Sequence, residues 1–177
     1  KANQKVKTAI KKTAGKILTW QKRPINTVYH ATNGGVMASV DEAWSINQVP
    51  YLQMRLDGPK RWTRTVELPL SNEKYLKSFL FSKSDAFGSD HPLFRWERTL
   101  DSSQVYKMLN QAKKVSTKFY PNKIKVMRRG TSGRVTSLKI EGMTGSEIHL
   151  KLDDIRRVLR QLPSTLFVVK EIKEGKW

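Results

Sequence analysis

The last third of the sequence constrains the fold most strongly, because it contains three short segments in which apolar and polar residues alternate. These segments span residues 123–128, 134–140 and 147–152, and such alternation is typical of a strand with one buried face. Glycine-containing turns at 130–133 and 142–145 separate the segments. Strands joined by turns this short predict antiparallel neighbours in one sheet.

The remaining segments predict a mixture of short helices and strands. Capping residues followed by apolar residues at helical spacing indicate helices at 72–81, from 101 or 102 to 114, and from 153 or 154 to 162. Runs of β-branched and aromatic residues, or alternation, favour strands at 15–20, 25–30, 62–68, 93–100 and 165–172. The first 14 residues allow a short helix or an extended arm.

The order of these elements predicts an α+β fold, with mainly antiparallel sheet and two or three short helices. A length of 177 residues fits a single domain, residues 1–177, with a loop-rich insertion near 59–92. No apolar run reaches the length of a membrane-spanning helix. The lack of an initiating methionine and of a signal peptide indicates a processed chain or a fragment.

The chain is strongly basic and contains no cysteine. It has 34 Lys and Arg against 15 Asp and Glu, a formal net charge of +19 and a pI of about 10.3. Residues 1–23 contain eight Lys or Arg, residues 107–134 contain nine, and neither stretch contains an acid. This charge favours a polyanionic partner such as nucleic acid, an anionic membrane surface or an acidic cell wall. The lack of cysteine excludes disulfides, iron–sulfur clusters, Cys-based zinc sites and cysteine nucleophiles.

One region combines the residue types of a sugar-binding groove. A predicted strand ends at a histidine, polar residues and two glycines follow, and two aromatic residues stand within the next twenty positions. Flat aromatic faces and short polar side chains are what a sugar ring contacts, whereas the alternative is a hairpin exit with two core aromatics. The candidate substrate-binding residues are Tyr29, His30, Thr32, Asn33, Gly34, Gly35, Asp41, Trp44 and Tyr51.

Local geometry gives specific expectations for this groove. Side chains alternate along a strand, so Tyr29 and His30 should face opposite ways. We expect Tyr29 to be buried and His30 to lie at the rim, hydrogen-bonded to Asp41 or Thr32. Glu42 stands three residues after a serine that could cap a helix, which is the spacing of a capping box.

Other catalytic or metal-binding patterns are weak. His30 has the chemistry of a general base or a metal ligand, but the three histidines lie in different elements without a ligand-like spacing. We therefore predict no metal and no cofactor. No nucleophile elbow or nucleotide-binding loop is present, and Ser132 is explained as a turn residue.

The motifs resemble the stage II sporulation protein D family, which includes the LytB-type amidase enhancers. The matching pieces are Thr13 and Gly15, Pro24-Ile25, Tyr29-His-Ala-Thr32, Gly34-Gly35, Asp41-Glu-Ala-Trp44 and Pro50-Tyr-Leu52. Further pieces follow at Phe94-Arg-Trp-Glu97, Ser132-Gly-Arg-Val135 and Ile155-Arg156. The resemblance covers about residues 9–58 and 93–170, and the order and spacing of the pieces are more specific than any one of them.

The resemblance implies a peptidoglycan-binding or peptidoglycan-remodelling protein of the periplasm or cell wall. Active relatives are lytic transglycosylases, in which a Glu within an Ala-Glu-Met-Pro segment serves as acid and base. This sequence contains no such segment, so we assign no catalytic residue in this chain, and the resemblance places that Glu upstream. Some relatives bind zinc beside the glycine pair, but Asn33 stands where they carry a cysteine.

The sequence leaves open whether the chain cleaves glycan strands, only binds them, or acts as an amidase enhancer whose partner is a cell-wall amidase. The rival hypothesis is a basic nucleic-acid-binding protein. The two basic stretches contain few aromatic residues, and these are not interleaved regularly with the basic ones as single-strand binders require for stacking. We therefore expect glycan strands rather than nucleic acid as the partner.

Overall fold

The computed structural model describes residues 3–44, 46–115, 119–160 and 162–177, so Lys1 and Lys118 of the two basic stretches lie outside the described residues. The chain divides into two compact units, residues 1–31 and residues 32–177. Each unit is described by itself. Within the described residues, no helix is long and apolar enough to cross a membrane.

The first unit contains one helix and one small hairpin. Helix α1 spans Gln4–Thr13 and begins at Asn3, whose side chain accepts a hydrogen bond from the Lys5 N–H at 3.0 Å. Strands β1 (Thr19–Trp20) and β2 (Arg23–Pro24) pair in antiparallel fashion. The predicted strand at 15–20 is therefore reduced to Thr19–Trp20, and the one predicted at 25–30 does not form. The short unit buries no side chain against which a longer strand could pack.

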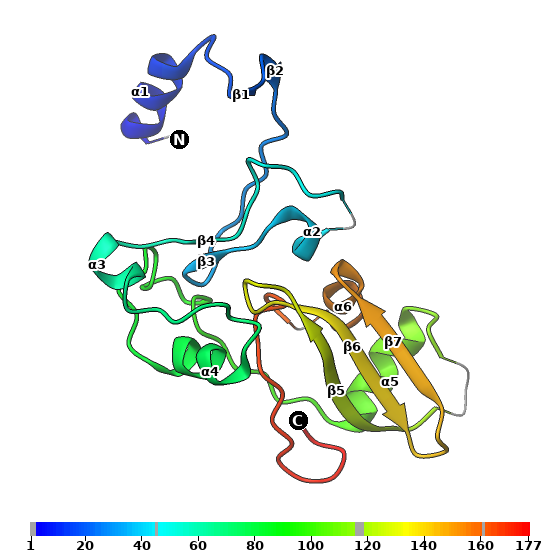
Figure 1. The fold of residues 1–177 in the computed structure, drawn as a ribbon. Helices are drawn as coiled ribbons and strands as arrows, with labels where there is room; N and C mark the ends of the chain where they lie inside the picture. Colours follow the sequence, from blue (N-terminus) through cyan, green and yellow to red (C-terminus); the bar gives the residue numbers. More distant parts are fainter. Residues whose placement is uncertain (1–2, 45, 116–118, 161) are drawn as a thin grey trace. The chain divides into compact units, whose positions relative to one another are not determined.

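The second unit contains the predicted three-stranded antiparallel sheet (Figure 1). Its strands are β5 (Pro121–Arg129), β6 (Val135–Gly142) and β7 (Glu147–Lys151), in that order. Val126 lies opposite Leu138, and Leu138 lies opposite Leu150. This register puts the apolar side chains of all three strands on one face, as the alternation in the sequence predicts.

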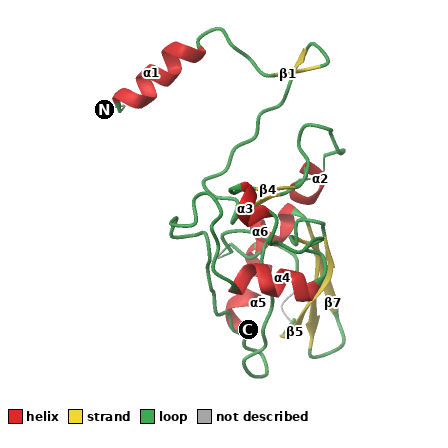
Figure 2. Cartoon of the chain, turned by 60° about the vertical axis from the view of Figure 1, so that its left-hand side comes forward, coloured by secondary structure: helices red, strands yellow, loops and turns green. Residues whose placement is uncertain are grey.

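Helices cover that apolar face (Figure 2). Helix α5 (Ser102–Gln111) begins with a complete capping box, in which Asp101 and Gln104 satisfy each other's backbone N–H. Helix α6 spans Asp153–Val158 and is shorter than predicted; residue 161 of that prediction lies outside the described residues. The buried side chains of this first core are Leu100, Val105, Met108, Leu109, Phe119, Val135, Leu138, Ile140, Leu150, Ile155, Val158, Leu159 and Trp177.

A second core forms around the segments before the sheet. Strands β3 (Val36–Met37) and β4 (Arg55–Leu56) pair in antiparallel fashion, helix α2 spans Val40–Ala43, helix α3 spans Lys60–Thr63, and helix α4 spans Glu73–Phe81. Helix α4 confirms the predicted apolar stripe, since Leu76 and Phe79 are buried in this core. The buried side chains of the second core are Val36, Trp62, Leu70, Leu76, Phe79, Ala86, Phe94 and Leu166.

Within the second unit, three further predicted strands do not form, those at 62–68, 93–100 and 165–172. Residues 60–63 form helix α3, and Trp62 enters the second core from it. Residues 93–100 bury Phe94 and Leu100 but form no strand; at their end, the Leu100 N–H and carbonyl pair with the backbone of Trp177.

Residues 165–169 pass between the two cores and form no strand. Leu166 and Val168 pack on the second core, while Phe167 and Val169 pack on the first. Successive side chains of this connecting segment therefore point alternately into the two cores. The α+β class with small antiparallel sheets is confirmed.

Candidate functional site

The buried carboxylate of Glu42 links helix α2 to the turn between β5 and β6. Glu42 is only 6% exposed. The Thr131 hydroxyl donates a hydrogen bond to its Oε1 at 2.8 Å, and the Ser132 N–H donates to its Oε2 at 3.2 Å. The Ser132 hydroxyl donates a further bond to the same carboxylate. Three donors satisfy the buried oxygens, so this contact fixes two segments that are 90 residues apart.

The turn that receives the carboxylate depends on Gly130. A Cβ atom at this position would lie 2.1 Å from Glu42 Cδ, closer than any real side chain allows. Gly133 closes the turn with φ +81°, a conformation that glycine adopts without strain, and its N–H donates to the Gly130 carbonyl at 2.9 Å. Both glycines therefore shape the receptor for Glu42.

Arg134 extends this cluster from the turn to the segment before α2. Its guanidinium donates to the backbone carbonyls of Asn33 and Val36, each at 3.0 Å. Burial lowers the pKa of Arg134 to about 10, and the negative charge of Glu42 partly opposes that effect. The carboxylate of Glu42 thus offsets part of the desolvation of the Arg134 guanidinium. We call Asn33, Glu42, Thr131, Ser132 and Arg134 the Glu42 cluster.

Asn33 also fixes the glycine loop that precedes α2. Its Oδ1 accepts a hydrogen bond from the Gly35 N–H at 2.8 Å, and its Nδ2 donates to Asp57 at 2.6 Å. Arg95 donates to the Gly34 carbonyl at 2.9 Å. The loop is therefore held by side chains from three other segments.

The two glycines of this loop closely approach the protein's own core. Gly34 and Gly35 are buried and have φ values of +68° and +91°. A Cβ atom at Gly35 would lie 2.9 Å from Ala86 Cβ and 3.3 Å from the Trp62 ring. The buried loop of Asn33, Gly34 and Gly35 consequently packs beneath the candidate site and does not line an open surface.

Three of the predicted residues lie on or near the outer side of α2. Asp41 is exposed, Trp44 is 39% exposed and Tyr51 is half-buried. The Val40 N–H donates to the Leu52 carbonyl at 3.0 Å, and the Val40 carbonyl accepts from the Trp44 N–H at 2.9 Å. Trp44 and the segment around Tyr51 therefore flank the same helical residue. Thr32 is half-buried, and its hydroxyl accepts a bond from the Gly34 N–H at 3.3 Å.

Tyr29 and His30 belong to the other compact unit. Tyr29 is 96% exposed, so the expectation that it is buried is wrong; the strand that would have turned it inward does not form. His30 is exposed, and its bond to Asp41 or Thr32 stays a prediction.

The capping-box interpretation of Glu42 is also wrong. Ser39 precedes α2 but makes no side-chain capping bond, and the Glu42 carboxylate points to Thr131 and Ser132 instead. Local spacing alone cannot distinguish these outcomes, because the competing donors come from the distant β5–β6 turn. Ser132 is a turn residue, as predicted, and in addition a carboxylate ligand.

The Glu42 cluster holds α2 against the β5–β6 turn and offers no reactive group of its own. A general acid must reach the atom that it protonates, and Glu42 is nearly inaccessible with its oxygens already bonded. In the part of the chain that the structure describes, no three His, Asp or Glu side chains come together to hold a metal ion. The exposed groups beside α2 offer an indole face and a carboxylate for binding.

The sequence of residues 38–177 matches a family described as a domain of unknown function, DUF8618. This chain belongs to the DUF8618 family. The matched range includes α2, β4 and the β5–β6 turn, so the DUF8618 region carries both halves of the Glu42–Ser132 contact. Neither a curated protein nor a solved structure matches the chain significantly.

Proposed function

We propose that this chain binds the glycan strands of peptidoglycan through the surface formed by Asp41, Trp44 and the segment around Tyr51. The single observation that carries the proposal is the contact between Glu42 and Ser132. The two motif pieces around Asp41–Trp44 and Ser132–Val135, in which we see the resemblance to the sporulation protein D family, contact each other through this bond. Motifs that are separate in sequence but contact each other support a common role in one site.

The exposed residues next to this contact suit a sugar chain. Trp44 exposes part of its side chain, and Asp41, three residues earlier, is exposed as well. Aromatic faces bury sugar C–H groups, and a carboxylate accepts sugar hydroxyl protons. The Glu42 cluster holds α2, which carries Asp41 and is followed directly by Trp44, so binding needs little ordering of the protein.

Binding fits this surface better than cleavage does. Asp41 is the one exposed carboxylate of α2 in the described residues, and the buried Glu42 is not available as an acid. The chain would then bind peptidoglycan in the periplasm or cell wall, either alone or as an enhancer of a cell-wall amidase.

Co-sedimentation with glycan strands freed of stem peptides tests the proposal. We expect the wild-type chain to sediment with the strands and Trp44→Ala to lose at least tenfold in affinity, since aromatic anchors carry much of the binding energy. The matched control is Phe81→Ala, which removes an aromatic side chain that is 74% exposed on α4. No sedimentation of the wild type, or equal losses in both variants, overturns the proposal. Mass spectrometry of the same samples for anhydro-muropeptides reports any cleavage.

The net charge of +19 favours a second candidate, a nucleic-acid-binding protein. Filter binding across salt concentrations discriminates it from the first. Nanomolar affinity at physiological salt with a strong preference among nucleic-acid sequences would favour this candidate over a wall glycan.

A further inference from the structure

The three-stranded sheet has a second face, which the Glu42 cluster does not use. The apolar face packs on α5 and α6, and in Figures 1 and 2 no helix of residues 32–177 covers the opposite face. We call this opposite face of β5, β6 and β7 the outer sheet face. Lys125 lies opposite Lys139, which lies opposite His149, so all three strands contribute to it in register.

Cations dominate the outer sheet face. Its Lys and Arg residues are Lys123, Lys125, Arg128, Lys139 and Lys151. Its acids are Glu141 and Glu147. The chain has no acid at all from residue 102 to residue 140, so this part of the fold has a clear excess of positive charge.

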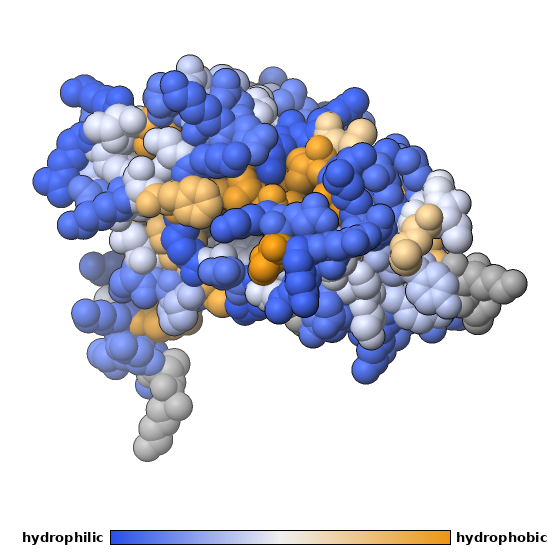
Figure 3. Space-filling view, turned by 90° about the horizontal axis from the view of Figure 1, so that it is seen from below, coloured by the Kyte–Doolittle hydropathy of each residue, from blue (hydrophilic) through white to orange (hydrophobic). Residues whose placement is uncertain are grey.

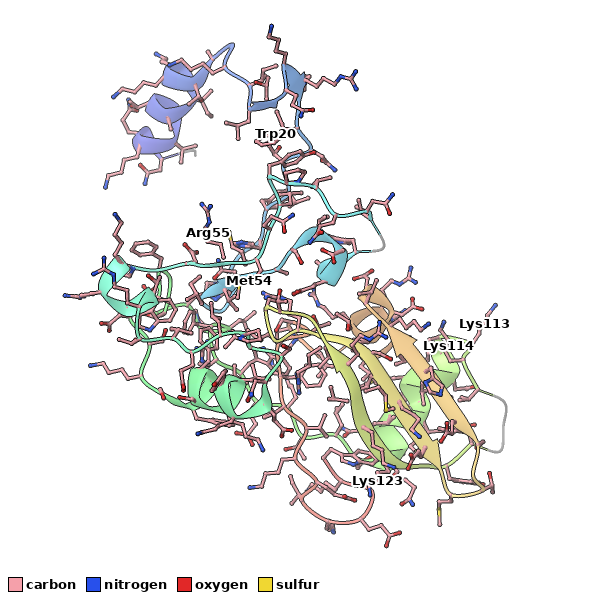
Figure 4. The ribbon with its side chains drawn as sticks, in the orientation of Figure 1. Trp20, Met54, Arg55, Lys113, Lys114 and Lys123 are labelled. Carbon is pink, nitrogen blue, oxygen red and sulfur yellow. The ribbon has the colours of Figure 1, made fainter. Side chains whose placement is uncertain are left out.

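Both acids are already engaged by neighbouring lysines. Glu141 accepts from Lys125 at 2.7 Å and lies 2.8 Å from Lys139, while Glu147 lies 2.7 Å from Lys139. Lys123, Arg128 and Lys151 are exposed, and none of them forms an ion pair within the described residues. These three cations remain available to an anionic ligand; Lys123 stands near the beginning of β5 (Figure 4).

The side chains of this face also indicate which kind of polyanion it suits. Single-stranded nucleic acids bind through aromatic side chains that stack on the bases. The outward residues of β5, β6 and β7 include Met127 and His149 but no Trp, Tyr or Phe. Lysine is a flexible point charge and attracts a phosphate in any orientation. Figure 3 views the surface from a different side, and there hydrophilic residues surround hydrophobic patches.

We propose that the outer sheet face binds a flexible phosphodiester polymer that carries no stacking bases. Arg128 on β5 and Lys151 on β7 lie in register on either side of Ser137, so two strand spacings of about 4.8 Å each separate these two cations. A flexible chain can place phosphates beside both of them and beside Lys123, which lies further along β5. This inference does not require the glycan surface beside α2, because the residues involved are different.

Titration of the full chain with synthetic poly(glycerol phosphate) tests the proposal, with the Kd measured over a series of NaCl concentrations. The variant Lys123→Gln/Arg128→Gln/Lys151→Gln removes the three exposed cations of the face. The control Lys60→Gln/Arg64→Gln/Lys83→Gln removes the same charge from exposed positions on and after α3 and after α4. Circular dichroism and urea midpoints check that both variants fold as the wild type does.

We expect the face variant to bind at least tenfold more weakly than the control, and its slope of log K against log salt to fall by about 2, since each lost phosphate contact removes about 0.7. Equal weakening in both variants would show attraction by net charge alone and would overturn the proposal. No binding by the wild type would overturn it as well. Tighter binding of a single-stranded oligonucleotide with the same number of phosphates, lost in the face variant, would replace it with a nucleic-acid site.

The same variants separate this proposal from the proposed function. Trp44→Ala should leave poly(glycerol phosphate) binding unchanged, and the face variant should retain binding to glycan strands. Failure of one interaction therefore leaves the other to be judged by its own result.

Discussion

At the scale of single residues, the candidate site depends on the buried Glu42 and the half-buried Arg134. Glu42 accepts hydrogen bonds from three donor groups of Thr131 and Ser132, and Arg134 donates to the backbone carbonyls of Asn33 and Val36. Removing one partner of such an arrangement leaves buried donors unsatisfied. A substitution that changes only a few atoms of this cluster should therefore lower the free energy of unfolding substantially.

Glu42→Gln should destabilise the protein by about 2–4 kcal/mol. The new amide NH₂ would face the donors of Thr131 and Ser132, and the guanidinium of Arg134 would lose the negative charge that opposes its desolvation. Urea unfolding followed by circular dichroism measures the change. Asp41→Asn is the matched control, since it neutralises the exposed neighbouring carboxylate and should change stability by less than about 0.5 kcal/mol. Equal midpoints for the two variants would contradict a structural role for the Glu42 carboxylate.

At the scale of elements, the ion pairs across β5, β6 and β7 make the sheet sensitive to acid. Hydrogen bonds from Lys125 and then Lys139 lower the pKa of Glu141 from 4.5 to about 2. Because the pKa is depressed in the folded state, these pairs contribute stability above the unfolded value of 4.5, and the contribution is lost as the pH falls towards 2. The lysines that face Glu141 belong to its own strand and to β5.

We expect the melting temperature of the wild type to exceed that of Glu141→Gln by a constant amount above about pH 5, and by less at each lower pH. Calorimetry from about pH 6 to about pH 2 measures the difference. Repeating the comparison in a Lys125→Gln background should reduce it, because the largest cause of the shift is removed. A difference that does not vary with pH would contradict the assignment.

At the scale of the whole molecule, the two compact units differ in how much they bury. Both cores lie within residues 32–177, whereas residues 3–31 contain no buried side chain. A segment that buries no side chains unfolds locally at little cost in free energy. The two units should consequently differ in their resistance to proteases.

Limited trypsin digestion should first remove the residues up to about Lys22, and a fragment containing residues 32–177 should persist. Mass spectrometry of a time course identifies the cut sites. The internal control is the sheet, whose many Lys and Arg residues between 121 and 151 should be cut much later because β5, β6 and β7 are hydrogen-bonded to one another. An early cut within the sheet would refute this difference.

The sequence by itself determined the elements whose side chains have one partner surface. The strands β5, β6 and β7 alternate for a single core, and α4 and α5 have capping residues and one apolar stripe, so local pattern and tertiary packing agree. The α+β class follows from these elements alone. The strong positive charge and its segregation were also readable without a structure.

Only the tertiary structure decided the elements that face two surfaces or none. Residues 165–169 alternate because they serve two cores, and residues 25–30 have strand-like composition but no packed partner. Glu42 has the spacing of a capping residue, yet Thr131 and Ser132 offer its carboxylate a buried set of donors. A local pattern states what a segment prefers, whereas partners distant in sequence determine which preference is satisfied, because burial requires their donors and side chains.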